Sequence, residues 1–182
     1  MEELVLSEEA FLARLRDRRK KTFEIKHVRV EATEGIKELV IDLDELKLGW
    51  LKLTSCILPP LRISGSPPHE GKVPPCVLLD NVCCPSLIFE NDFQEVETRT
   101  VKTKELAFSE NSDSGITTLI INGDYGEIKL WSRSSWITFN GAQTDFLDVR
   151  CGPCDGVENL YDSALPLTVR NLIRVKPVHV YC

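Results

Sequence analysis

Cys151 and Cys154 are the residues of this chain whose spacing best suits chemistry. Two cysteines separated by two residues supply half of a tetrahedral zinc site, and zinc needs four ligands. Cys83 and Cys84 are the candidates for the other half. No cofactor is expected apart from a possible zinc ion. Its ligands would be Cys151 and Cys154 together with Cys83 and Cys84, or together with Cys76 and Cys83, and His69 is a further candidate ligand.

Two other interpretations of these cysteines stay open. The tetrapeptide Cys-Gly-Pro-Cys at 151–154 resembles the active-site sequence of thioredoxins, which implies a redox dithiol, and the resemblance covers these four residues alone. Alternatively, the cysteines are small buried side chains and the tetrapeptide is a tight turn. The chain has no second pair of this spacing, and Cys83 and Cys84 would point to opposite faces of an extended strand. We therefore expect the structural role.

Other catalytic patterns are missing from the sequence. It contains no GxSxG, HExxH, P-loop or GxGxxG motif. His27, His69 and His179 lie far apart, and nothing near them indicates a nucleophile or an acid–base pair. Enzymatic activity is uncertain on sequence alone, and we expect a non-enzymatic protein.

The segment 58–75 is the first candidate binding surface. It contains three Pro-Pro pairs and two glycines, which exclude a helix or a central strand. This composition predicts a long exposed loop, and long loops are often functional or disordered. If the loop recruits a protein partner, the contacting residues would be Pro59, Pro60, Pro67, Pro68 and His69. The alternative is a mobile insertion without a partner.

A second candidate surface combines aromatic rings with cations. Single-stranded nucleic acid binds where bases stack on aromatic rings and cations follow the phosphates. The residues of that kind are Arg18, Arg19, Lys20, Lys21, Lys129, Trp131, Arg133 and Trp136. Each group also has a simpler interpretation, since basic residues complement a helix C-terminus and tryptophans fill a core.

The strand pattern that must position these residues is clearest at 116–140. Short apolar or alternating runs are separated there by turn signals, including Asn122-Gly123, a dipeptide typical of type I′ hairpin turns. Earlier, the alternation at 22–31 changes face near His27, which indicates a bulge or a strand covered at both ends. Roughly ten short strands at spacings near 8–12 residues favour a sandwich or barrel, and we find no internal repeat.

One helix is predicted at 7–20, with Ser7 as its N-cap, followed by Glu8 and Glu9. The predicted fold is therefore all-β, an antiparallel β-sandwich or partly open β-barrel with one N-terminal α-helix. The helix, 1–21, packs on a single β-rich domain, 22–182, which carries the loop at 58–75.

Composition limits the function. The 182 residues carry a net charge of −6, which disfavours non-specific nucleic-acid binding. No apolar run is long enough to span a bilayer, the N-terminus is unlike a secretory signal, and seven cysteines then indicate reduced thiols. We predict a cytoplasmic or nuclear binding module that acts as a subunit or adaptor of a protein assembly. The alternatives are an OB-like barrel that binds single-stranded nucleic acid, with or without a structural zinc, and a thiol redox protein.

Overall fold

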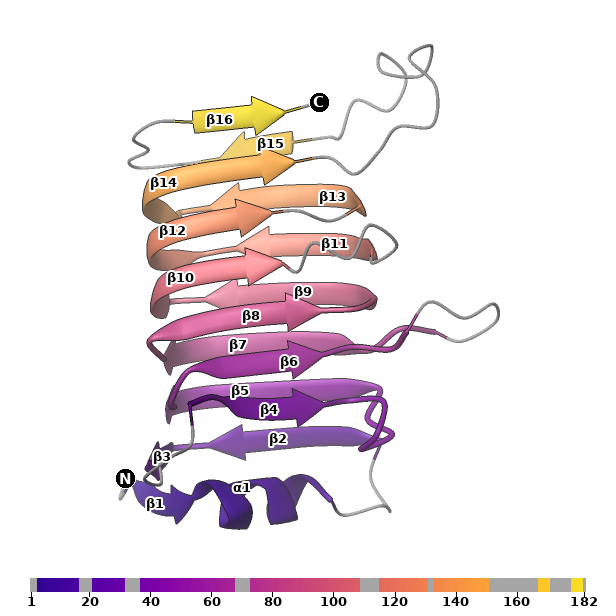
Figure 1. Ribbon diagram of the computed structural model, residues 1–182, viewed down its shortest axis with the longest axis vertical. Coiled ribbons are helices and arrows are strands. Elements are labelled where there is room, and N and C mark those ends of the chain that lie inside the picture. The colour runs from indigo at the N-terminus through magenta and orange to yellow at the C-terminus, as the bar shows by residue number, and fades with distance from the viewer. Residues whose placement is uncertain are drawn as a thin grey trace.

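The chain forms a parallel β-solenoid, seen in a computed structural model (Figure 1). The structure describes residues 3–16, 21–31, 37–67, 73–108, 115–130, 133–150, 167–170 and 178–181. Each turn places one strand in each of two facing sheets, and every strand pair that joins neighbouring turns is parallel.

Two stacks of strands make up the solenoid. The stack that we call the back sheet contains β2 (Thr22–Lys26), β5 (Trp50–Ile57), β7 (Cys76–Cys83), β9 (Phe93–Arg99), β11 (Gly115–Ile121), β13 (Arg133–Asn140) and β15 (Leu167–Arg170). The front sheet contains β4 (Leu39–Asp42), β6 (Leu61–Ser64), β8 (Ser86–Glu90), β10 (Val101–Phe108), β12 (Gly123–Leu130), β14 (Gln143–Arg150) and β16 (Val178–Tyr181). Front and back strands run in opposite directions, as Figure 1 shows.

A corner joins the end of each back strand to the next front strand. At four successive corners a residue in the left-handed conformation turns the chain: His27, Ser55, Asn81 and Thr100, with φ of 53° to 54°. Each lies two positions after an inward-facing residue of the back sheet. A short third row of strands forms along this side, where β3 (Val28–Glu31) pairs with β1 (Leu4–Ser7) and with the end of β5.

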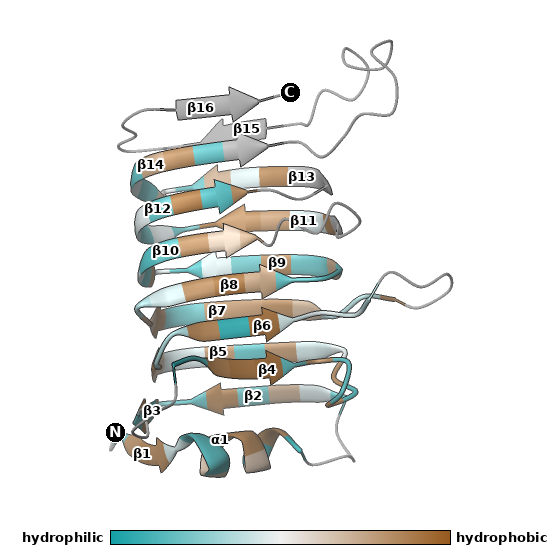
Figure 2. Ribbon diagram, viewed as in Figure 1, coloured by the Kyte–Doolittle hydropathy of each residue, from teal (hydrophilic) through white to brown (hydrophobic). Residues whose placement is uncertain are grey.

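The core is built from apolar residues that stack on one another at equivalent positions of successive turns. In the front sheet Leu39, Leu61 and Leu87 lie in register, and all three are fully buried. In the back sheet Leu51, Val77 and Val96 do the same. The apolar bands in Figure 2 recur along both sheets for this reason. Alternate residues therefore face solvent on both flat faces of the molecule.

The helix α1 (Glu8–Leu15) covers the N-terminal end of the solenoid. Ser7 is its N-cap as predicted, and the side-chain oxygen of Ser7 accepts a hydrogen bond from the backbone N–H of Ala10 at 3.2 Å. Phe11 and Leu15 are buried in the core cluster. The helix therefore closes the apolar interior, as a terminal cap must in a stacked fold.

The predicted antiparallel sandwich or barrel is wrong. The all-β character holds, but each strand pairs with the strand one turn away rather than with its neighbour in sequence. Cys76, for example, pairs with Glu95, which lies 19 residues later. Alternation with a period of two is the same in parallel and antiparallel strands, so the pattern could not distinguish them. The sequence shows no obvious repeat, because the turns share inward-facing apolar positions at variable spacing rather than identical residues.

Asn122-Gly123 shows the error locally. The dipeptide does not close a hairpin, because β11 and β12 belong to different sheets. Gly123 has a φ of 145°, whereas a type I′ turn needs positive φ at both central residues, and Asn122 does not have it. A glycine is required here by proximity: a Cβ on Gly123 would lie 2.2 Å from the carbonyl oxygen of Val101 in the turn below.

The predicted long loop at 58–75 is also wrong in its first half. Residues Leu61–Ser64 form strand β6, and Leu61 and Ile63 are fully buried. Pro59 and Pro60, directly before this strand, lie at a corner between the two sheets. Backbone N–H groups at a corner do not take part in the hydrogen-bond ladder of a sheet, so prolines are tolerated there. The connection between β6 and β7 is 65–75 only.

Candidate functional site

On one side of the solenoid front strands end and back strands begin, and we call this side the loop edge. Between Trp50 and Arg150 the two connections longer than three residues, 65–75 and 109–114, both lie on the loop edge, whereas 91–92, 131–132 and the corner connections have three residues or fewer. Outside that range the corner side also carries two connections of seven residues, 32–38 and 171–177. Insertions in a stacked fold project from one face without disturbing the core, and that face is often the binding face.

The connection 65–75 leaves the solenoid through a clamped base. Ser66 and Asp92 form an antiparallel bridge, with the N–H of Asp92 donating to the carbonyl oxygen of Ser66 at 2.9 Å. At the other end, Pro75 accepts a hydrogen bond from the N–H of Gln94 at 3.0 Å. The two ends of the connection are thus fixed to the next turn of the solenoid.

Gly65 makes this base possible. Its N–H donates to the carbonyl oxygen of Glu90 at 2.8 Å, and a Cβ at this position would lie 2.1 Å from the carbonyl oxygen of Asp92. Only a residue without a side chain permits so close an approach between two backbones. The exit of the loop is therefore determined by packing against the turn at Asp92.

The loop edge carries exposed apolar and acidic side chains. Val73 is 80% exposed, the highest value among the large hydrophobic residues in the part of the chain that the structure describes. The carboxylates at the ends of β4 and β8, and just after those ends, are Asp42, Asp44, Glu45, Glu90 and Asp92, of which Glu45 is exposed and the others are half-buried. Asp42 is held in place because its Oδ1 accepts from the backbone N–H groups of Asp44 and Glu45, both at 2.9 Å. This edge offers an exposed apolar residue together with several carboxylates and the exposed cations Lys21 and Lys47.

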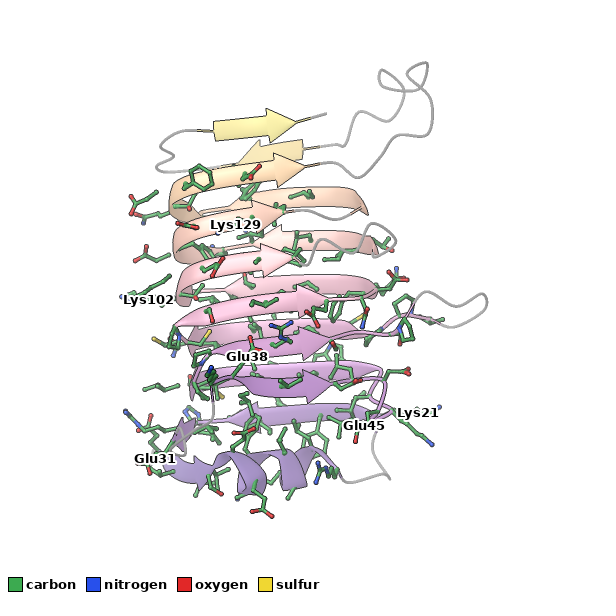
Figure 3. All side chains as sticks on the ribbon, viewed as in Figure 1. Lys21, Glu31, Glu38, Glu45, Lys102 and Lys129 are labelled. Carbon is green, nitrogen blue, oxygen red and sulfur yellow. The ribbon has the colours of Figure 1, made fainter. Side chains whose placement is uncertain are left out.

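A second feature is a set of ion pairs on the solvent-exposed side of the front sheet. The Arg62 guanidinium contacts the carboxylates of Glu38, at 2.8 Å, and of Glu90. Lys129 contacts Glu105 at 2.9 Å and Glu127 at 2.8 Å. Figure 3 labels Glu38 and Lys129 on this face. Hydrogen bonds to its carboxylate partners, with Glu127 first, raise the pKa of Lys129, and the bond to Glu38 chiefly raises the pKa of Arg62.

The predicted partner-binding prolines separate in the structure. Pro59 is buried, and Pro60 is half-buried beside it. Pro67 is half-buried at the start of the loop, whereas Pro68 and His69 lie outside the described residues. Of the predicted set, Pro67 is therefore the member that the described structure places on the loop edge.

The predicted nucleic-acid surface is not assembled by the described residues. Lys129 belongs to the front sheet, and Arg133 and Trp136 belong to a strand of the back sheet. Lys21 is exposed beside the first turns, far along the solenoid from them. Arg18, Arg19, Lys20 and Trp131 lie outside the described residues.

The cysteines of the predicted zinc site face different environments. Cys83 is exposed on the third row, and Cys84 points into the core, where burial raises the pKa of its thiol to about 12. The two side chains therefore do not converge on one point. Cys151 and Cys154 lie outside the described residues, and among those that are described no three His, Cys, Asp or Glu side chains form a group able to hold a metal. The zinc and redox hypotheses stay predictions.

Sequence reasoning missed the Glu38, Arg62 and Glu90 cluster. These residues lie 24 and 28 positions apart in sequence, as counted from Arg62. Nothing local marks them, because only the register of β4 with β6 and that of β6 with β8 bring them together. A search for outward charges at one-turn spacing would have found them.

No protein-family profile, curated protein or solved structure matches this chain. Within the part that the structure describes, no helix is long and apolar enough to cross a membrane.

Proposed function

We propose that this chain is a non-enzymatic scaffold that binds a protein partner, as a subunit or adaptor of a larger assembly, through its loop edge. The observation that carries the proposal is that, between Trp50 and Arg150, both connections longer than three residues lie on the same side of a regular stack. A solenoid fixes the relative positions of such loops over several turns, so a partner meets a rigid arrangement at little cost in conformational entropy.

The loop 65–75 is the element that we expect to make contact. Its base is held by backbone hydrogen bonds at Ser66 and Pro75, so the loop leaves the stack in a defined direction. Val73 provides exposed apolar surface on an edge that also carries charged residues. Apolar anchors with a polar rim are the usual composition of protein interfaces.

The test replaces residues 67–74 with a short Gly-Ser linker and leaves Ser66 and Pro75 in place. Proteins captured from native extract by the wild-type chain should be lost from the variant, while the melting temperature stays nearly unchanged. Replacing 109–114 on the same edge is the control for a general effect of loop shortening. Nuclease treatment of the extract tests the nucleic-acid alternative in the same experiment, because capture through nucleic acid would disappear.

The same proteins captured by the wild-type chain and the 67–74 variant would contradict the assignment of this loop. Capture that only nuclease abolishes would favour the nucleic-acid alternative instead.

A further inference from the structure

The outer surface of the front sheet has three parallel columns of side chains, which we call the front face. The central column is Val40, Arg62, Ile88, Ala107 and Lys129, each in register with the next. One flanking column contains Glu105 and Glu127, and the other contains Asp42, Ser64 and Glu90. At the usual strand spacing the central column is about 19 Å long, the length of about six extended residues.

Carboxylates outnumber cations on the front face. Its exposed or half-buried described carboxylates are Glu38, Asp42, Glu90, Glu105, Asp124, Glu127 and Asp145, whereas Asp148 is buried. Its described cations are Arg62 and Lys129 in the central column and Lys102 and Lys104 at the corner end of β10. Arg62 and Lys129 are each already held between two carboxylates. The face therefore carries a net negative charge that its own side chains do not neutralise.

The outer surface of the back sheet is nearly balanced. Its described carboxylates are Glu24, Asp80, Glu95 and Glu97, and its described cations are Lys26, Lys52 and Arg99. Glu24 contacts both Lys26, at 3.1 Å, and Lys52, at 2.8 Å. The excess of carboxylates over cations is thus larger on the front face than on the back face.

The middle of the front face has a distinct composition. Between Arg62 and Lys129 the central column carries Ile88 and Ala107, which are half-buried, outward-facing and apolar. Glu90 lies two positions beyond Ile88 on β8, and Glu105 lies two positions before Ala107 on β10. An apolar strip about two strands wide is therefore flanked on opposite sides by carboxylates.

This composition suits the side chain of a lysine or arginine, which has an apolar stem and a cationic end. The stem would cover Ile88 and Ala107, and the cation would lie beside Glu90 or Glu105. Neighbouring basic residues of an extended segment would meet Glu127 and Glu38 in the same way. Charge complementarity of this kind steers association and determines orientation.

We propose that the front face docks an extended, lysine- and arginine-rich segment of a protein partner, with one basic side chain lying over Ile88 and Ala107. The proposal rests on the proposed role as a binding scaffold, but not on the loop 65–75. Loss of binding through the loop variant and loss through front-face variants can therefore be told apart.

The test uses a fluorescently labelled oligolysine peptide, with fluorescence anisotropy at low salt. Ala107→Lys places a cation of the protein itself on the apolar strip. The variant should bind the peptide roughly tenfold more weakly, because the new lysine repels the basic peptide and takes the place of the peptide cation beside the front-face carboxylates. Thr118→Lys, at a half-buried outward position of the back sheet, makes the same change in net charge. This control should leave the affinity within about twofold, since the added charge is distant and screened.

A second pair of variants covers the case in which Ala107→Lys does not fold. Glu105→Gln removes a front-face carboxylate but leaves Lys129 paired with Glu127, and Glu97→Gln is its back-face control. Glu105→Gln should weaken binding and Glu97→Gln should not. Equal weakening by front and back variants would mean that net charge alone attracts the peptide, and absence of binding at low salt would also overturn the proposal.

Discussion

Cys84 is an acid that the fold keeps neutral. Its side chain is 3% exposed, and burial is the main cause that raises the pKa of its thiol to about 12. Burial likewise raises the pKa of Tyr125, whose hydroxyl lies 2.8 Å from the Thr98 Oγ1 atom inside the corner. Because both folded-state pKa values exceed the unfolded ones, the stability they contribute is complete below the unfolded pKa and is lost as pH rises.

We expect the free energy of unfolding to fall above about pH 8.5, the pKa of an unfolded cysteine, by up to about 1.4 kcal/mol per pH unit from Cys84 alone. Urea unfolding under reducing conditions at a series of pH values measures this slope. Cys84→Ala should reduce the slope, whatever its effect at pH 7. An unchanged slope in that variant would show that the thiol does not titrate as its burial requires.

Asn122 completes a corner that is one residue short. Glu97 pairs with Ile120, and Val101 pairs with Gly123. Between these two pairs the chain advances four residues in one turn of the solenoid but only three in the next. The Asn122 side chain spans the difference: its Oδ1 accepts from the N–H of Thr100 at 3.0 Å, and its Nδ2 donates to the carbonyl oxygen of Asn140. One carboxamide therefore links the turns on either side, in place of the absent backbone.

Asn122→Ala should lower the free energy of unfolding by about 1–3 kcal/mol, because both backbone groups lose their partner. Asn122→Asp should lower it less, since the carboxylate still accepts from Thr100 although it cannot donate to Asn140. Chemical denaturation of the three proteins gives the order. If both variants lose the same free energy, the acceptor half of the bridge contributes nothing.

At the scale of the whole molecule, stability is transmitted between adjacent turns. Each turn packs only on its neighbours, so a stacked fold responds locally to damage. The N-terminal end depends on α1, whose Phe11 is fully buried over the first turns. Its exposed residues, Glu9, Ala13, Arg14 and Arg16, give the cap a mainly polar outer side.

Phe11→Ala should cost about 3–5 kcal/mol of stability in its surroundings. Hydrogen exchange should accelerate in β2 and β4 and change little in β12. Phe139→Ala removes the same side chain from a fully buried position in β13, and exchange should then accelerate near β11 and β13 instead. Uniform acceleration by both variants would show that the solenoid unfolds as one cooperative unit.

The local features of this protein can be read from its amino-acid sequence. The all-β character follows from alternating apolar residues, and the burial of Ile137 and Phe139 on one side of β13 agrees with that alternation. The helix start at Ser7 follows from the chemistry of an N-cap. The change of face at His27 was also visible, and the structure identifies it as a corner between sheets rather than a bulge. Each of these depends on residues only a few positions apart.

Which strands pair, and therefore which surfaces exist, follows only from the three-dimensional fold. The alternation within β11 and β12 is compatible with a hairpin, yet the chain crosses to the other sheet at Asn122, because apolar residues one turn apart then stack on both sides. The front face arises from that register: Arg62 meets Glu90, and Ile88 meets Ala107, across gaps of 28 and 19 residues. Local propensity carries no information at those distances, so the pairing follows from burial of the whole core.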